Sequence, residues 1–197
     1  MGTDPLDKGS GAEVGRQHVR AFFGLPVPEP QRAGLADFVA ACAQAAPDFR
    51  WTPAANLHLT VRFIGHVERA VVEEIAARLA ARSLPAFDLE LGELGTFKRG
   101  RLVRVVWLGL RSGVEAATRL AAEVEAACIE AGLEAEKRPF RAHLTLARAR
   151  ARDGAALPAL PAPNRLAPSR ATELVLYSSH LGRTGSVYES LRVVQLD

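Results

Sequence analysis

The chain contains segments with hydrophobic residues at every third or fourth position and others with hydrophobic residues at every second position. The first pattern is typical of amphipathic helices and predicts helices over 30–45, 68–82 and 113–131. The second, bounded by Gly or Pro, predicts β-strands. The predicted strands cover residues 18–25, 49–52, 57–64, 87–94, 102–110, 140–149, 172–179 and 187–196.

Glycine and proline mark the predicted connections between these elements. Residues 95–100 are expected to form the turn between two strands, and Gly182 and Gly185 lie in the turn of the last strand pair. The Pro-rich segment 157–168 is predicted to be a surface loop. Gly132 directly follows the third helix, where a C-cap glycine is favoured.

The order of strands and helices is similar in the two halves of the chain. It predicts an α+β protein with two pseudo-symmetric lobes of antiparallel sheet and outer helices around a central cleft. Residues 1–17, rich in Gly and mixed charges, are expected to form a flexible N-terminal tail. Residues 18–197 are then long enough for a single bilobal domain with one sizeable core.

The tripeptide His-Leu-Thr occurs in both halves, each time within a predicted strand. Because side chains alternate along a strand, His58 shares a face with Thr60, and His143 shares a face with Thr145. Together these residues would supply an acid, a base and two hydroxyl donors, which suffice to cleave a phosphodiester without a metal. A single His in an apolar strand is more often a core residue, but its duplication favours catalysis.

The composition of the chain bears on its location in the cell and on whether this chemistry needs a metal or cofactor. The chain has 197 residues, of which 48% are hydrophobic and 24% are charged, and no apolar run is long enough to span a membrane. Cys42 and Cys128 both lie in Ala-rich helical segments, so we expect buried free thiols and a cytoplasmic location. Metal sites need three or four ligands, and no Cys or carboxylate has a supporting spacing, so neither metal nor other cofactor is expected.

Basic residues gather in two places although the net charge is only +3. One cluster lies within 98–104, and a second lies within 137–152, which contains no acidic residue and surrounds the second His-Leu-Thr. Such clusters suit a polyanionic substrate. The alternative is that they are solvated loop charges.

Taken together, these segments resemble the 2H phosphoesterase superfamily. Within it, the chain is most similar to the RNA 2′,3′-cyclic phosphodiesterases, historically called 2′-5′ RNA ligases. The similarity extends from about residue 18 to the end. The matching segments are Arg20–Pro26, Asn56–Gly65, Val105–Gly109, Arg138–Arg148, Leu176–Ser179 and Val187-Tyr188.

The resemblance implies that a terminal 2′,3′-cyclic phosphate of RNA is opened to a 2′-phosphate, with reversible 2′-5′ ligation and no ATP. It implies that His58 donates a proton to the leaving ribose oxygen and that His143 accepts one from water. Thr60 and Thr145 would donate to the non-bridging phosphate oxygens. Arg148 would contact the phosphate, but strict alternation points it away from His143, so this role requires the strand to bend or end there.

Phe22, Phe63 and Tyr177 are candidates for substrate binding, since aromatic rings stack on nucleobases. The alternative is that they pack in the core or along the strands. Two other functions stay open: an RNA-end-binding protein without turnover, and a related enzyme acting on small cyclic nucleotides or 2′-5′ oligonucleotides. RNA is the expected partner, no membrane is expected, and we expect a monomer.

Overall fold

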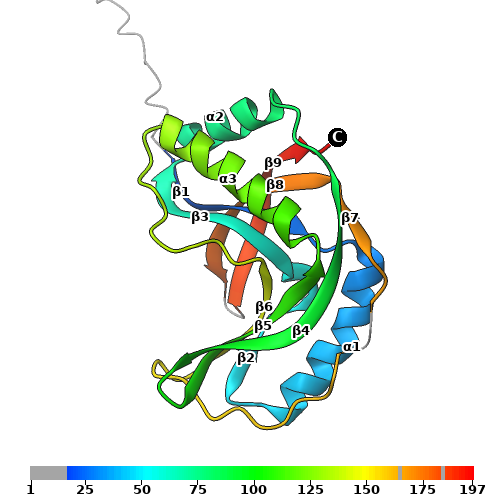
Figure 1. Ribbon diagram of the computed structural model, residues 1–197. Helices are drawn as coiled ribbons and strands as arrows, with labels where there is room; N and C mark the ends of the chain where they lie inside the picture. The colour runs from blue at the N-terminus through cyan, green and yellow to red at the C-terminus, as the bar shows by residue number, and fades with distance from the viewer. Residues whose placement is uncertain (1–16, 164–165, 183–184) are drawn as a thin grey trace, which may run out of the picture.

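The computed structural model describes residues 17–163, 166–182 and 185–197 (Figure 1). The described residues form one nine-stranded sheet, three α-helices and one short 3-10 helix. The elements are β1 His18–Pro26, α1 Glu29–Ala45, β2 Phe49–Trp51, η1 Ala54–Asn56, β3 His58–Glu68, α2 Arg69–Ala80, β4 Phe87–Arg99, β5 Leu102–Ser112, α3 Val114–Glu130, β6 His143–Ala149, β7 Ser169–Ala171, β8 Glu173–Gly182 and β9 Gly185–Gln195.

The strands form two lobes that meet at β3 and β6. Their order is β7-β4-β5-β6-β3-β1-β8-β9, with β2 also pairing with β6, and every pair is antiparallel. One lobe contains β3, β1, β8 and β9, and the other contains β6, β5, β4, β7 and β2. The predicted α+β fold class with two antiparallel lobes is confirmed. The two motif strands are therefore direct neighbours at the junction of the lobes.

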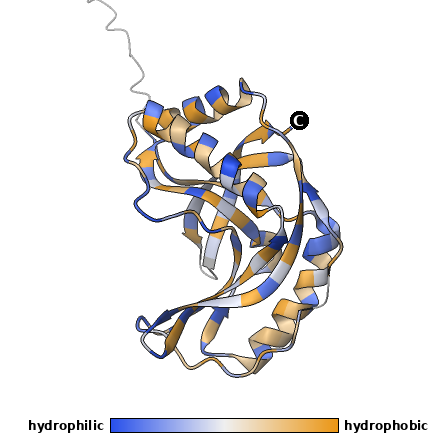
Figure 2. Ribbon diagram, in the orientation of Figure 1, coloured by the Kyte–Doolittle hydropathy of each residue, from blue (hydrophilic) through white to orange (hydrophobic). Residues whose placement is uncertain are grey.

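The three α-helices are divided between the two lobes (Figure 1). α2 and α3 pack on the lobe that contains β3, and α1 packs beside β2 of the other lobe. Each helix carries both hydrophobic and hydrophilic residues along its length (Figure 2). Leu35 and Phe38 of α1 and Val124 of α3 belong to the core. No helix in the described part of the chain is long and apolar enough to cross a membrane.

Both cysteines lie in this core. Cys42 of α1 and Cys128 of α3 are fully buried free thiols, as predicted. Burial raises the pKa of each thiol to about 11, so both stay protonated near neutral pH.

The predicted turn over 95–100 is wrong, because β4 continues as a strand to Arg99. Gly95 pairs with Trp107 of β5, and a Cβ at this position would lie 2.1 Å from the Trp107 ring. The glycine therefore makes room for an indole instead of turning the chain. The chain reverses at Gly100, whose φ of +58° suits glycine.

Three further predictions differ from the structure or fall outside it. Residues 140–142 precede β6 without joining it, and the short strand β7 was not predicted. Gly182 and Gly185 pair as the ends of β8 and β9, while the turn between them lies outside the described residues. Residues 1–16 of the predicted tail also lie outside the described residues.

Candidate active site

The two His-Leu-Thr segments lie side by side and antiparallel. Leu59 pairs with Leu144, and both leucines are 2% exposed in the core beneath the helices. In this register His58 lies opposite Thr145 and Thr60 lies opposite His143, because the pairing runs in opposite directions. Directly opposite residues share a face, so two imidazoles and two hydroxyls lie together on the face away from the core.

Each imidazole is held by the backbone two residues before it. The Nδ1 atom of His58 lies 2.8 Å from the carbonyl oxygen of Asn56, and Nδ1 of His143 lies 2.6 Å from that of Arg141. A carbonyl oxygen only accepts hydrogen bonds, so Nδ1–H donates in both cases. The Nε2 atom of each ring is thereby left as the nitrogen that can take up or release a proton.

The side chains of Asn56 and Arg141 also anchor these carbonyls to the two lobes. Asn56 Nδ2 donates a 2.9 Å hydrogen bond to the carbonyl of Ser186 in β9. The Arg141 guanidinium lies 4.6 Å from the centre of the Trp107 ring and 5.6 Å from that of Phe97. Sequence reasoning missed Asn56 and Arg141. Their common spacing of two residues before His is visible in the chain, but their role depends on neighbouring strands.

Aromatic rings surround His58 on the first lobe. Phe22 packs on it with ring centres 4.7 Å apart, and Tyr188 meets its edge at 5.2 Å. Tyr177 stacks on Phe22 at 5.0 Å and lies 6.0 Å from the His58 ring. Phe22 is only 3% exposed, so its ring has no free face for a nucleobase. The substrate-stacking role predicted for Phe22 is therefore wrong, and its alternative as a packing residue holds.

Phe63 and Tyr177 stay available as substrate-binding candidates. Phe63 is 38% exposed, and the Arg20 guanidinium lies 5.1 Å from the centre of its ring. Tyr177 is half-buried beside His58, and burial raises the pKa of its hydroxyl. Both rings lie on the lobe that carries His58.

His143 has its own aromatic support on the second lobe. Phe97 meets the imidazole edge-on at 5.2 Å, and Trp107 lies 6.0 Å away. One side of the Trp107 ring lies against Gly95, and Arg141 lies over the ring. The Phe97 and Trp107 rings, packed in this way, orient the imidazole of His143.

A register shift between β5 and β6 turns Arg148 toward the histidines. Trp107 pairs with Thr145 and Val106 pairs with Ala147, so Leu146 is an extra residue in β6. The strand alternation restarts after Leu146, and Arg148 shares the face of Thr145. An extra residue of this kind bends the strand, as the role expected of Arg148 requires. β3 has a corresponding extra residue, Val61, directly after Thr60.

The surroundings lower the pKa of both imidazoles. Burial is the main cause at His58 and at His143, and the carbonyl hydrogen bonds partly oppose it. The positive charge of Arg148 lowers both pKa values, the charge of His143 lowers that of His58, and Arg141 lowers that of His143. Arg148 therefore lies within electrostatic reach of both imidazoles, and His143 lies within reach of His58.

The hydroxyls and the guanidinium on this face are free to bind a ligand. Within the part of the chain that the structure describes, the side chains of Thr60, Thr145 and Arg148 make no hydrogen bond or ion pair. Two arginines of the basic clusters are instead paired with carboxylates, Arg99 with Asp153 and Arg138 with Glu136. Among the described residues, no group of three or more His, Cys, Asp or Glu side chains is arranged to hold a metal ion.

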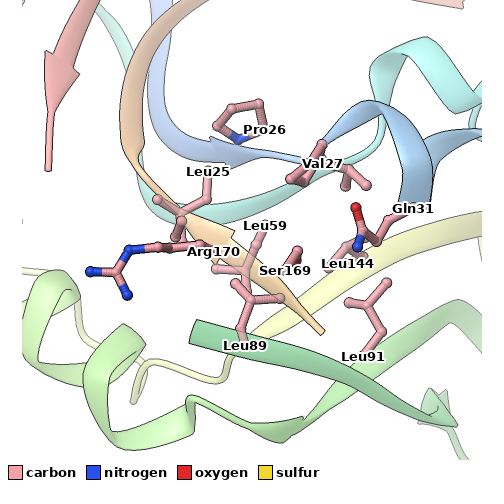
Figure 3. A pocket seen from close by; sticks show the side chains of 12 residues that line it. Leu25, Pro26, Val27, Gln31, Leu59, Leu89, Leu91, Leu144, Ser169 and Arg170 are labelled. Atoms are coloured by element: carbon pink, nitrogen blue, oxygen red, sulfur yellow. The ribbon is translucent and has the colours of Figure 1, made fainter. Parts of the chain in front are cut away.

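The opposite face of the motif strands borders a small apolar cavity of about 20 Å³ (Figure 3). Leu59 and Leu144 line it, together with Leu25 and Leu91. Gln31 of α1 closes it and donates from Nε2 to the carbonyl of Ala167 at 3.1 Å. The leucines of the two motifs therefore support the sheet from behind and take no part in the polar face.

The fold and the paired His-x-Thr strands define a 2H-type phosphoesterase. The family described as LigT like Phosphoesterase matches residues 25–107 and, separately, residues 108–188, and the chain belongs to this family. Each match contains one His-Leu-Thr segment. The resemblance seen in the sequence is confirmed.

Named relatives and solved structures agree with this assignment. The chain is 36% identical to an RNA 2′,3′-cyclic phosphodiesterase of Aeropyrum pernix over 71% of this chain and 82% of the relative. It is 32% identical to that of Escherichia coli over 88% and 94%. The crystal structure of E. coli LigT complexed with 3′-AMP superposes with a TM-score of 0.77 at 27% identity, over 91% of this chain and 99% of that one.

Proposed function

We propose that the protein is a metal-independent RNA 2′,3′-cyclic phosphodiesterase that opens the terminal cyclic phosphate to a 2′-phosphate. The observation that carries this proposal is the pair of imidazoles on one sheet face, each with Nδ1–H bound to a carbonyl and Nε2 left for proton transfer. The names of the relatives at 36% and 32% identity support the substrate class. In this proposal residues 18–197 form a single bilobal domain, and the protein acts as a monomer.

The reaction needs one proton taken up and one released. Neutral His143 accepts a proton at Nε2 from water while the water oxygen forms a bond to phosphorus. The bond between phosphorus and the ribose O3′ breaks, and protonated His58 gives its Nε2 proton to O3′. The phosphate stays on O2′. The reverse reaction, with an RNA 5′-hydroxyl in place of water, forms a 2′-5′ linkage.

The other polar groups of the face stabilise the phosphate. Thr60 and Thr145 donate hydroxyl hydrogen bonds to the non-bridging oxygens, where negative charge develops in the transition state. Arg148 binds the same phosphate through its guanidinium. Phe63, with Arg20 beside it, offers an exposed ring on which a nucleobase stacks. The buried free thiols support a cytoplasmic location for this activity.

Product analysis in EDTA tests the proposed function. Purified protein incubated with adenosine 2′,3′-cyclic phosphate and excess EDTA is expected to form adenosine 2′-phosphate, because the two histidines supply both proton transfers. Chromatography against the 2′- and 3′-phosphate standards identifies the product.

Other outcomes point to the alternatives. RNA binding without product, in EDTA or after added Mg²⁺, would establish an RNA-end-binding protein. Turnover of a 2′-5′ dinucleotide but of no 2′,3′-cyclic phosphate would establish a related enzyme. Formation of the 3′-phosphate would contradict the proposed leaving oxygen.

The pH dependence should report the two histidines as a coupled pair. Activity requires one protonated and one neutral imidazole, so kcat/KM should be bell-shaped. Both pKa values are lowered from 6.5 in the free protein, so the optimum of kcat/KM should lie below pH 6.5. Arg148→Ala removes a positive charge that lowers both pKa values, so both limbs of its profile should move to higher pH.

The same variant should bind substrate more weakly, with a smaller dependence of KM on salt. Arg78→Ala on the outer helix α2 is the control, because Arg78 pairs with Glu74 and lies on the far side of the sheet. If the pH profile of kcat/KM for Arg148→Ala coincided with that of the parent protein, Arg148 would not be part of the site.

A further inference from the structure

Two arginines lie directly opposite each other beside the site. Arg50 of β2 pairs with Arg148 of β6, so their side chains share one sheet face. The neighbours of Arg50 point to the other face, since Phe49 is 1% exposed and Trp51 Nε1 donates to the carbonyl of Ala46. Arg50 and Arg148 are both exposed. The pair extends the polar face of the histidines onto β2, which lies along the same edge of β6 as β3.

This pairing is unfavourable for the folded protein on its own. Like charges directly opposite each other in a sheet are destabilising. Neither guanidinium has a carboxylate partner among the described residues, and Arg150, diagonally beside Arg50, donates to the carbonyl of Pro47 instead. By contrast, nine other arginines of the described residues form ion pairs with carboxylates. These are Arg32, Arg62, Arg69, Arg78, Arg82, Arg99, Arg111, Arg138 and Arg170.

An anionic ligand would relieve this repulsion, and two adjacent guanidinium groups match two adjacent phosphates. Arg148 lies within electrostatic reach of both histidines, whereas Arg50 lies one strand farther from His143. A mononucleotide substrate ends at its cyclic phosphate. An RNA strand has one more phosphodiester on the 5′ side of its last nucleoside.

We propose that Arg50 binds the phosphodiester that precedes the terminal nucleotide of RNA, while Arg148 contacts the terminal cyclic phosphate. This inference rests on the proposed function and adds a preference for strands over mononucleotides. Arg50 is distinct from the proton-transfer groups, so it contributes to binding and leaves the chemical step unchanged.

The test compares two substrates in Arg50→Gln. With a tetraribonucleotide ending in a 2′,3′-cyclic phosphate, KM should rise about tenfold at unchanged kcat, since a charge-assisted contact is lost. The slope of log KM against log salt should fall by about 0.7, the value for one phosphate of a single strand. With adenosine 2′,3′-cyclic phosphate, all constants should match those of the parent protein.

Arg78→Gln on α2 is the matched control, because it makes the same change at an exposed arginine away from this face. Urea unfolding of Arg50→Gln should show no loss of stability, because repulsion with Arg148 is removed. An equal loss on both substrates, or an unchanged KM for the tetranucleotide, would overturn the proposal.

Failure of the proposed function would be recognised separately. If the parent protein turns over neither substrate, fluorescence anisotropy with a labelled tetraribonucleotide bearing a terminal 2′-phosphate measures binding alone. Tenfold weaker binding by Arg50→Gln would still support the phosphate contact. Equal affinity for the parent and the variant would overturn it.

Discussion

His58→Ala and His143→Ala are each expected to lower kcat for adenosine 2′,3′-cyclic phosphate by about 10³- to 10⁴-fold. Each variant loses one of the two proton transfers, and the remaining imidazole cannot supply both in one turnover. Because the two groups act as a unit, the double variant should lose little more than either single variant. Steady-state and single-turnover rates near the pH optimum measure the effect.

His66→Ala is the control for this experiment. His66 is an exposed residue of the same strand β3, and it lies beyond the register shift at Ile64. Circular dichroism and urea unfolding should show that all three variants fold. A histidine variant of the motif that keeps parent turnover would refute the role proposed for that residue.

Thr145→Val and Thr60→Val should each reduce kcat by about 10²- to 10³-fold, or about 3 to 4 kcal/mol in barrier height. Valine keeps the β-branched shape that suits a strand and removes only the hydroxyl donor. The donated hydrogen bond strengthens as charge develops on the phosphate, so kcat should fall more than KM changes.

Thr172→Val, at an exposed position directly before β8, provides the matched control. Kinetics with a thiophosphate analogue of the substrate would add a second measurement, because sulfur accepts hydrogen bonds weakly. A motif variant whose loss appears in KM alone would show that the hydroxyl contributes only to ground-state binding.

Local patterns in the sequence predicted most elements to within a few residues. The helical periodicity of 30–45 and 113–131 corresponds to α1 and α3, and Gly132 caps α3 with a φ of +84°. The error at 95–100 has a specific cause. Gly95 indicates a turn in the sequence, whereas its neighbour across the sheet, Trp107, requires a residue without a side chain.

The placement of Arg148 shows a second limit of local patterns. Counting alternate residues from His143 points Arg148 to the wrong face. The extra residue Leu146 reverses that result, and it is recognised only from the pairing of β6 with β5. Phe22 shows the same limit. From the sequence alone, an aromatic residue in a strand before a motif strand can stack on the substrate or pack inside the protein, and only its neighbours in the structure distinguish these roles. Its 3% exposure decides for the core.

The sequence by itself determined that each histidine shares a face with a threonine, because side-chain alternation follows from the backbone geometry of a single strand. Only the tertiary structure decided that the two motifs are antiparallel neighbours, that Asn56 and Arg141 hold the imidazoles, and that Arg50 lies beside Arg148. Strand pairing and register depend on contacts between segments far apart in the chain. No local periodicity encodes them.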